Sequence, residues 1–378
     1  MAEDPNAMNE DWELLKSLFP AGWEDLAHAR GATKGLRKNK AAGDLLRTLL
    51  MHVGCGYSLR ETAVRARQAD LAQISDVALL KRLRKSKDWL HALCAGLFAE
   101  RDWDAPAACA ESFYLLDASS VREPGKTGSQ WRLHYSVRWP SLRCDSFKVT
   151  PGEGGGTGES FVQFPVVAGG HYLADRGYSS ARGIRHVAER GGRLAVRLNP
   201  NAVRLCSEDG GLFPLLERLR ELDRPGRVSQ WPVTVVDRRG KEAAHGRLCA
   251  VRKSEEATRQ AAAKLRRKAQ KNGTNLQPET LEYSRFVLVF TTFEEGRFPP
   301  WKVLEWYRVR WQVELVFKRF KSIAELGHLP KHDPESSEAW LYGKLFVALL
   351  TEKLMAQAMA FSPWGYSIGG QPQPEPLA

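Results

Sequence analysis

The spacing of apolar residues changes near residue 112, and no other feature of the sequence restricts the fold more. Before this point, "DLLRTLLMHV" at 44–53 repeats apolar side chains with a helical period. After it, short apolar runs such as "SFYLLD" (112–117) and "RLAVRL" (193–198) are typical of buried strands. We therefore predict an α-helical N-terminal domain over residues 1–110, followed by an α/β fold with a mixed sheet flanked by helices.

The N-terminal region contains a basic cluster near the start of one helix. Ser58 and Glu61 have the spacing of a capping box, which predicts that a helix begins there. Another helix is expected after Ser75, continuing to about residue 98. A short connection followed by a basic helix would suit a helix-turn-helix-like DNA contact, but a solvated bundle face would have the same composition. The basic residues concerned are Lys81, Arg82, Arg84 and Lys85.

The formal net charge of +12 favours a polyanionic partner, either nucleic acid or an anionic membrane surface. The six cysteines include no CxxC pair and no cluster with zinc-ligand spacing, so we expect reduced thiols in a cytoplasmic protein. The acidic, polar N-terminus does not have the pattern of a secretory signal. No apolar run is long enough to span a membrane, and we expect no membrane partner.

Composition and turn residues divide the rest of the chain. Residues 111–200 and 286–330 are expected to form the two parts of one α/β core, interrupted by a β-rich subdomain at 201–285. That subdomain also contains a basic helix at about 255–271. Asp333 and Pro334 suit the N-cap and first position of a C-terminal helix within 331–362. The Pro/Gly-rich tail, residues 363–378, is expected to be disordered.

The segment "YRVRWQVELVFKRFK" (307–321) has a single carboxylate among many cations and aromatic rings. If this segment is a helix, four of its residues fall within an arc of roughly 60° on one face. An apolar stripe on a separate face would pack against a core. The carboxylate therefore lies between cations on an exposed face. The residues of this set are Tyr307, Arg310, Glu314 and Lys321.

Three carboxylates are placed where packing alone does not explain them. Asp117 and Asp175 end apolar strand-like runs, and Glu314 lies in mid-helix. Each has an ordinary interpretation: the aspartates can cap turns, and Glu314 can pair with a cation four residues away. Together, three carboxylates can hold two Mg²⁺ ions about 3.5–4 Å apart, an arrangement that cleaves phosphodiesters. We favour the joint interpretation.

The segments "DASSVREPG" and "LADRGYSS", with the Y-x2-R-x3-E-x6-K pattern at 307–321, resemble the three signature regions of bacterial DDE transposases. The spacing is that of the insertion-sequence-four group. The resemblance covers roughly residues 45–350. It implies an RNase H-like catalytic core interrupted by the insertion, with Asp117, Asp175 and Glu314 as the catalytic, metal-binding triad. The implied cofactor is Mg²⁺, two ions in number, for which Mn²⁺ can substitute.

The resemblance also implies roles for neighbouring side chains. Lys321 and Arg310 would contact DNA phosphates beside the cleavage point, and Tyr307 would bind a phosphate or stack on a sugar or base. Arg122 is a further candidate backbone contact or an ordinary surface arginine. Trp231 would stack a displaced base or, more in keeping with tryptophan, lie in a core.

The function implied is cut-and-paste DNA transposition: metal-dependent cleavage at inverted element ends, followed by strand transfer into target DNA. The partners would be double-stranded DNA and a second copy of the chain, in the bacterial cytoplasm and on the nucleoid when DNA is bound. Two alternatives remain: an RNase H-like nuclease without strand transfer, and an inactive relic that only binds DNA. Members of the group often continue further beyond the last helix, so a truncated, inactive protein is part of the second alternative.

Overall fold

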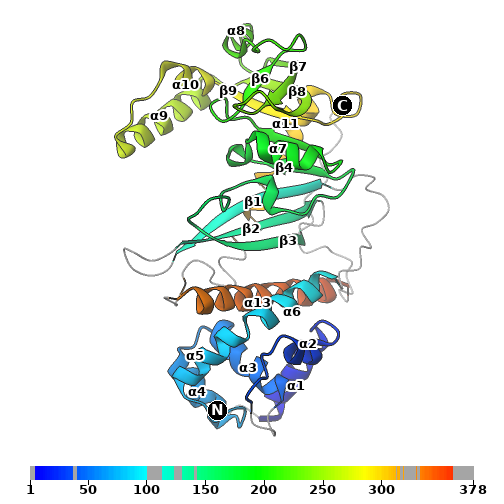
Figure 1. Ribbon diagram of the computed structural model, residues 1–378, viewed down its shortest axis with the longest axis vertical. Coiled ribbons are helices and arrows are strands. Elements are labelled where there is room, and N and C mark those ends of the chain that lie inside the picture. Colours follow the sequence, from blue (N-terminus) through cyan, green and yellow to red (C-terminus); the bar gives the residue numbers. More distant parts are fainter. Residues whose placement is uncertain are drawn as a thin grey trace. The chain divides into compact units, whose positions relative to one another are not determined.

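The computed structural model describes residues 5–36, 41–99, 113–122, 130–139, 143–311, 313–315, 318, 329 and 333–360 (Figure 1). The chain forms two compact units, which we describe separately. Unit 1 comprises Met1–Trp103, Val121–Ser129 and Lys318–Ala378, and unit 2 comprises Asp104–Ser120 and Gln130–Phe317.

Unit 1 is helical in its described part. Trp23 stacks on the fully buried Trp89 at 6.5 Å between ring centroids, and Phe346 is buried against Phe19. This core joins helices from both ends of the chain. They are α1 (Pro5–Ser17), α2 (Trp23–Ala29), α3 (Ala42–Val53), α4 (Leu59–Gln68), α5 (Asp76–Lys85), α6 (Lys87–Ala99) and α13 (Pro334–Ala360).

The helix that the sequence predicts after Ser75 is two helices in the structure, α5 and α6. The backbone N–H of Ser86 donates to the carbonyls of Arg82 and Leu83, and its hydroxyl donates to the Arg82 carbonyl at 2.9 Å. These bonds satisfy the end of α5, so the chain can turn there. The predicted cap at Ser58 is confirmed, since its hydroxyl oxygen accepts a hydrogen bond from the Glu61 N–H at 3.1 Å.

Unit 2 is built on one nine-stranded mixed sheet with the order β3-β2-β1-β4-β5-β9-β8-β7-β6. The β1–β4 and β4–β5 pairs are parallel, whereas β2–β3 and the pairs from β5 to β6 are antiparallel. The predicted mixed sheet flanked by helices is therefore confirmed. The strands are β1 (Phe113–Arg122), β2 (Gln130–Trp139), β3 (Arg143–Pro151), β4 (His171–Ala174), β5 (Arg193–Arg197), β6 (Arg204–Cys206), β7 (Val228–Val236), β8 (Glu242–Arg252) and β9 (Phe286–Thr291).

The residues expected to form a separate insertion, 201–285, contribute three strands to this same sheet. Strand β9 connects the two parts, because it pairs with β5 through Val196 and Phe290 and with β8 through Leu248 and Phe290. One apolar cluster continues from Tyr172 on β4 to Val235 on β7. The helices in this part are α8 (Leu215–Arg220), α9 (Glu255–Asn272) and α10 (Pro278–Tyr283).

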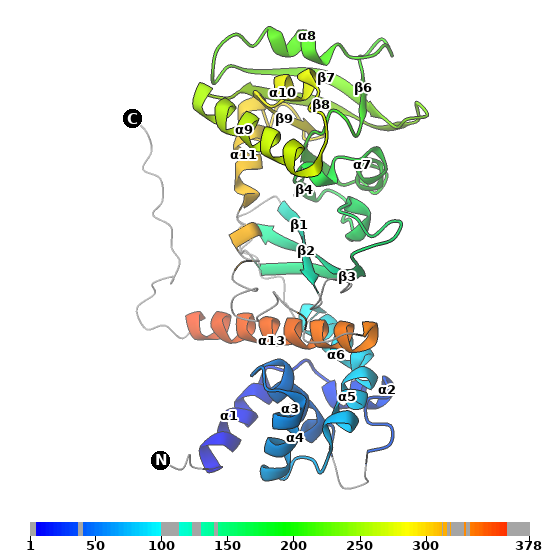
Figure 2. The same ribbon diagram turned by 90° about the vertical axis from the view of Figure 1, so that its left-hand side faces the viewer.

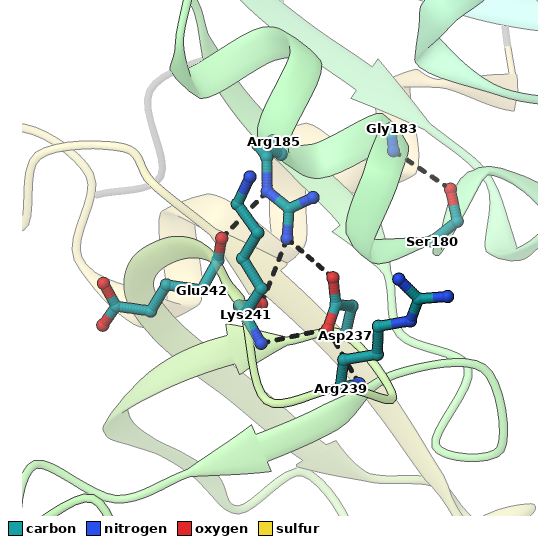
Figure 3. Close-up of polar contacts among 7 residues, drawn as sticks. All are labelled: Ser180, Gly183, Arg185, Asp237, Arg239, Lys241 and Glu242. Atoms are coloured by element: carbon teal, nitrogen blue, oxygen red, sulfur yellow. Dashed lines mark hydrogen bonds and ion pairs between the residues drawn. The ribbon is translucent and has the colours of Figure 1, made fainter.

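Helix α7 (Ala181–Ala188) is tied to the turn between β7 and β8 by one arginine (Figure 3). Arg185 donates hydrogen bonds to the carbonyl oxygens of Glu242 and Lys241 at 2.9 and 3.1 Å. It also pairs with Asp237 at 3.1 Å. Since Asp237 accepts backbone N–H groups of the same turn, Arg185 anchors the whole hairpin end to α7.

In the described part of the chain, no helix is long and apolar enough to cross a membrane. The cysteines that the structure describes form no disulfide with one another; they are Cys55, Cys94, Cys144, Cys206 and Cys249.

Candidate active site

The register of two parallel strands brings two aspartates to the same level. Leu115 on β1 lies opposite Leu173 on β4. Asp117 lies two residues after Leu115 on β1, and Asp175 lies two residues after Leu173, directly after the end of β4. Adjacent parallel strands lie about 4.8 Å apart, so the two carboxylates share one small region at this edge of the sheet.

Asp117 does not end its strand, as the sequence analysis expected. Strand β1 continues to Arg122, and Val121 near its end is fully buried. This apolar residue extends the strand pattern beyond the acid. The β1–β4 pairing nevertheless ends at Leu115, so Asp117 lies where the two strands have ceased to pair.

Asp117 is a half-buried carboxylate with two hydrogen-bond donors. Its Oδ2 accepts from the Tyr135 hydroxyl at 3.0 Å, and its Oδ1 accepts from the Ala118 N–H at 2.9 Å. Burial raises the pKa of Asp117, and the charge of Asp175 raises it further, against the lowering effect of the two donors and of Arg310. A group that is costly to ionise beside another carboxylate is a favourable position for a cation.

Asp175 directly follows β4 and begins the short helix η2 (Arg176–Tyr178). Its Oδ1 accepts a hydrogen bond from the Gly177 N–H at 2.8 Å, which fixes the carboxylate as the cap of this turn. Tyr178 is fully buried beneath it, and its hydroxyl has no hydrogen-bond partner among the described residues. Burial raises the pKa of Tyr178, and the charges of Asp117, Glu159 and Asp175 raise it further.

Glu159 is a carboxylate of this region that the sequence analysis missed. A side chain at Gly177 would collide with the Glu159 carboxylate, so this glycine lets Glu159 approach the turn that Asp175 caps. Burial raises the pKa of Glu159, and Asp175 and Asp117 add to the effect. Glu159 follows a glycine-rich loop and belongs to no strand or helix, so no periodic pattern marks it in the sequence.

Glu314, Arg310 and Tyr307 lie next to one another at the end of α11 (Pro300–Val309). Arg310 Nη2 pairs with Glu314 Oε1 at 2.8 Å, and the Arg310 guanidinium lies 5.8 Å from the centre of the Tyr307 ring. The Arg310 side chain is only 14% exposed, and its charge influences both Asp117 and Asp175. Arg310 is therefore the described residue that links Glu314 to the aspartate pair.

The sequence predicts one continuous helix over residues 307–321, but in the structure this helix is interrupted near its start. Helix α11 ends at Val309, and Arg310 lies in a turn before helical residues resume at Trp311. The N–H groups of Arg310 and Val313 bond to the carbonyls three residues earlier, Tyr307 and Arg310. Such tight bonds break the regular helical ladder. Lys321 lies outside the described residues.

The donor chemistry of the two aspartates fits a hard divalent cation, because Asp117 and Asp175 present carboxylate oxygens from neighbouring strands. No group of three or more His, Cys, Asp or Glu side chains positioned to hold a metal occurs within the described ranges. Glu314 is instead directed to Arg310. Its place as a third ligand remains a prediction.

A groove of about 850 Å³ lies beside Tyr307 and Arg310. Arg197 of β5 and Arg308 of α11 contribute cations to its lining, and Trp301 and Trp311 contribute aromatic rings that are 59% and 49% exposed. Valines of β7, β8 and β9, together with Leu304 and the acidic Glu305 of α11, complete the lining. Cations interspersed with exposed rings are the residue types that hold nucleic-acid strands.

The remaining candidate DNA contacts differ in their surroundings. Arg82 donates to the carbonyls of Lys34 and Gly35, and Arg84 pairs with Asp333 at 2.8 Å, so both have structural partners within unit 1. Lys81 and Lys85 are exposed.

Trp231 is half-buried on β7 and packs against the apolar cluster, with its ring 6.0 Å from that of Phe213. This favours the core role for Trp231. Arg122 ends β1, and its side chain lies outside the described part.

Comparison with known proteins identifies the family of the chain. Residues 161–350, which contain Asp175 and Glu314, match the family model of the transposase DDE domain. The chain is 30% identical to the protein InsL of insertion sequence element IS186A from Escherichia coli strain K12, over 95% of this chain and 97% of that protein. It is 30% identical to the transposase for insertion sequence element IS421 from Escherichia coli, with the same coverage. It is 21% identical to the transposase for element IS231B from Bacillus thuringiensis subsp. berliner, over 91% of this chain and 79% of that protein.

The large mixed sheet flanked by helices fits an RNase H-like DDE transposase. The chain belongs to the family of bacterial DDE transposases. Its partner is therefore DNA, and its activity belongs to the chemistry of transposition.

Proposed function

We propose that this chain is a cut-and-paste transposase of the insertion-sequence-four group, which cleaves DNA at its element's inverted ends and joins the freed end to target DNA. The observation that carries the proposal is the β1–β4 register, in which Leu115 pairs with Leu173, so that Asp117 and Asp175 each follow two residues after the last pair. The perturbed pKa of Asp117 supports it, because such a carboxylate is stabilised by a bound cation. The complete spacing of Tyr307, Arg310, Glu314 and Lys321 supports the choice of group.

In this proposal Asp117, Asp175 and Glu314 hold two Mg²⁺ ions, which Mn²⁺ can replace. When bound, the ions supply the activation of the attacking oxygen and the stabilisation of the leaving oxygen. Tyr135 and the Ala118 N–H orient the Asp117 carboxylate through the hydrogen bonds described above. Glu314 reaches the aspartates by leaving Arg310, which then becomes free to bind a phosphate of the DNA.

The DNA strand near the cleavage point would lie in the groove beside α11. Tyr307 and Arg310 line this groove, and Arg197 and Arg308 add positive charge to it. Lys321 would contact a further phosphate. Two element ends must be held together for joining, so the proposed assembly is a homodimer on DNA.

Cleavage of a DNA duplex carrying the inverted ends tests the proposal. With Mg²⁺, the wild-type protein should cut at the element boundary, and Asp117→Asn and Asp175→Asn should each reduce the rate by at least about a thousandfold, as loss of a transition-state contact of about 4 kcal/mol would. Asp209→Asn, an exposed aspartate in a turn, is the matched control and should cut normally.

The products distinguish the alternatives. Joined target DNA supports a transposase, and cleavage without joining would indicate a nuclease on the same fold. Binding to the ends without any cleavage by the wild-type protein would contradict the enzymatic proposal and leave a DNA-binding relic.

A further inference from the structure

Helix α9 is an exposed helix with an unusual charge distribution. None of its eighteen residues is buried. Glu255 and Glu256 occupy the first turn, and residues 257–272 then contain six cations and no acid. Figure 1 shows α9 reaching away from the sheet strands β8 and β9, and in Figure 2 it lies in front of them. The cations are Arg259, Lys264, Arg266, Arg267, Lys268 and Lys271.

Four of these cations form one face. At 100° per residue, Lys264, Arg267, Lys268 and Lys271 fall within an arc of about 100° and span about 10 Å along the helix axis. All four are exposed. Leu265 and Ala269, which are half-covered, lie to one side of this arc. The helix therefore leaves its most basic face free.

The cations of α9 have no ion pair or side-chain hydrogen bond with any residue in the described part of the chain. Several other arginines of the same unit do have carboxylate partners. They are Arg193 with Glu294, Arg218 with Glu221, Arg220 with Glu282 and Arg227 with Asp223. Exposed cations without a carboxylate partner also occur elsewhere in the described part of the unit, among them Arg204 and Arg238. What distinguishes α9 is that four such cations share one face of one helix.

This arrangement opposes the stability of the helix. Lys264 and Lys268, like Arg267 and Lys271, are like charges four residues apart, and each such pair destabilises a helix by about 0.2–0.5 kcal/mol. A polyanion would convert this repulsion into attraction. The exposed face has no large apolar residue, so it lacks both the apolar surface of a membrane-binding helix and the aromatic anchors of a protein interface.

From this juxtaposition we infer that the α9 face formed by Lys264, Arg267, Lys268 and Lys271 is a second DNA-binding surface, which binds the phosphate backbone of a duplex without reading its sequence. Flexible lysine and arginine side chains on an exposed helix neutralise phosphates and carry no base information. The inference rests on DNA being the substrate and does not depend on the metal chemistry proposed above.

The test measures the affinity of the full-length chain for a 30-base-pair duplex of arbitrary sequence, by fluorescence anisotropy in EDTA, across a series of NaCl concentrations. The variant carries Lys264→Gln, Arg267→Gln, Lys268→Gln and Lys271→Gln, which keep good helix formers in place. The matched control carries Arg193→Gln, Arg218→Gln, Arg220→Gln and Arg227→Gln, the same loss of charge at four arginines that have carboxylate partners. Circular dichroism verifies that both variants are folded.

We expect the α9 variant to bind at least about tenfold more weakly at 0.1 M salt and to reduce the slope of log K against log salt by about three, while the control changes the slope by less than about one. Equal effects of both variants would show a response to net charge alone and would overturn the inference, as would no effect of either. Because EDTA prevents metal-dependent cleavage, an inactive catalytic site would leave this result unchanged.

Discussion

At the scale of single residues, the candidate site combines features that do not favour folding. Asp117 and Asp175 face the same region from neighbouring strands, and Glu159 adds a third negative charge near them. The pKa of Asp117 is raised mainly by burial, and the charge of Asp175 raises it further. A fold that holds such groups together sacrifices stability for function.

Asp117→Asn should therefore stabilise the metal-free protein. The folded-state pKa of Asp117 lies above its unfolded value, so the ionised carboxylate lowers the stability of the fold once the pH exceeds both values. Removing the charge at pH 7 should raise the melting temperature in EDTA by about 1–3 °C. Mg²⁺ should raise the melting temperature of the wild type and have a much smaller effect on the variant, because ligands stabilise only the state that binds them.

Asp237→Asn is a control that should change the melting temperature in the opposite direction. The hydrogen bond from Arg185 lowers the pKa of Asp237, so its charge stabilises the fold at pH 7, and the variant should melt at a lower temperature in EDTA. A lower melting temperature for Asp117→Asn, or an unchanged response to Mg²⁺, would show that Asp117 is a structural residue.

At the scale of elements, the sequence predicted local features well and non-local ones poorly. The caps at Ser58 and Asp333 are confirmed, since each depends on side chains within three residues. The break at Ser86 was missed, because Ser86 has no proline or glycine beside it to signal the end of a helix. The sequence also did not predict that β8 pairs with β9 in one sheet, because strand pairing between distant segments leaves no local pattern.

Substitutions at Asp333 test one such local feature, the N-terminal cap of helix α13. Asp333 caps the helix because its carboxylate accepts a hydrogen bond from the Ser336 N–H at 3.0 Å. The same carboxylate forms an ion pair with Arg84 of α5. Burial opposes its ionisation, but hydrogen bonds from Arg84 and Ser336 lower its pKa to about 2. Asp333→Ala should cost about 1–2 kcal/mol in free energy of unfolding at pH 7, most of it from the cap, because solvent screens the partly exposed ion pair. Asp333→Asn should cost less, since asparagine caps equally well.

The pH dependence has a definite sign. Because the folded pKa of Asp333 is below the unfolded value of about 3.9, its stabilisation is complete above that value and is lost as the pH falls towards 2. The difference in stability between wild type and Asp333→Asn, measured by urea denaturation, should shrink between pH 5 and pH 2. A difference that stays constant over this range would contradict the role given to the Arg84–Asp333 pair.

At the scale of the whole molecule, the sequence indicated the chemistry more completely than the architecture. Asp117 and Asp175 are candidates from the sequence because each follows an apolar, strand-like run, and in the structure each lies two residues beyond the last β1–β4 pair, Leu115 and Leu173. Glu159 could not be found in this way, because only the folded loop brings it to Gly177. The basic residues Arg82 and Arg84 were grouped with the DNA contacts by composition alone, and the structure gives both of them partners inside unit 1.

The central claim is that Asp175 binds the metal ion that DNA cleavage requires, and a change of metal preference tests it most directly. Asp175→Cys replaces a hard oxygen ligand by a thiolate, which Mn²⁺ accepts more readily than Mg²⁺. In single-turnover cleavage of element-end DNA, we predict that this variant is inactive with Mg²⁺ and recovers at least about tenfold in rate with Mn²⁺. Asp175→Ser should not recover with either ion. An Asp175→Cys variant that is equally active, or equally inactive, with both ions would contradict the claim.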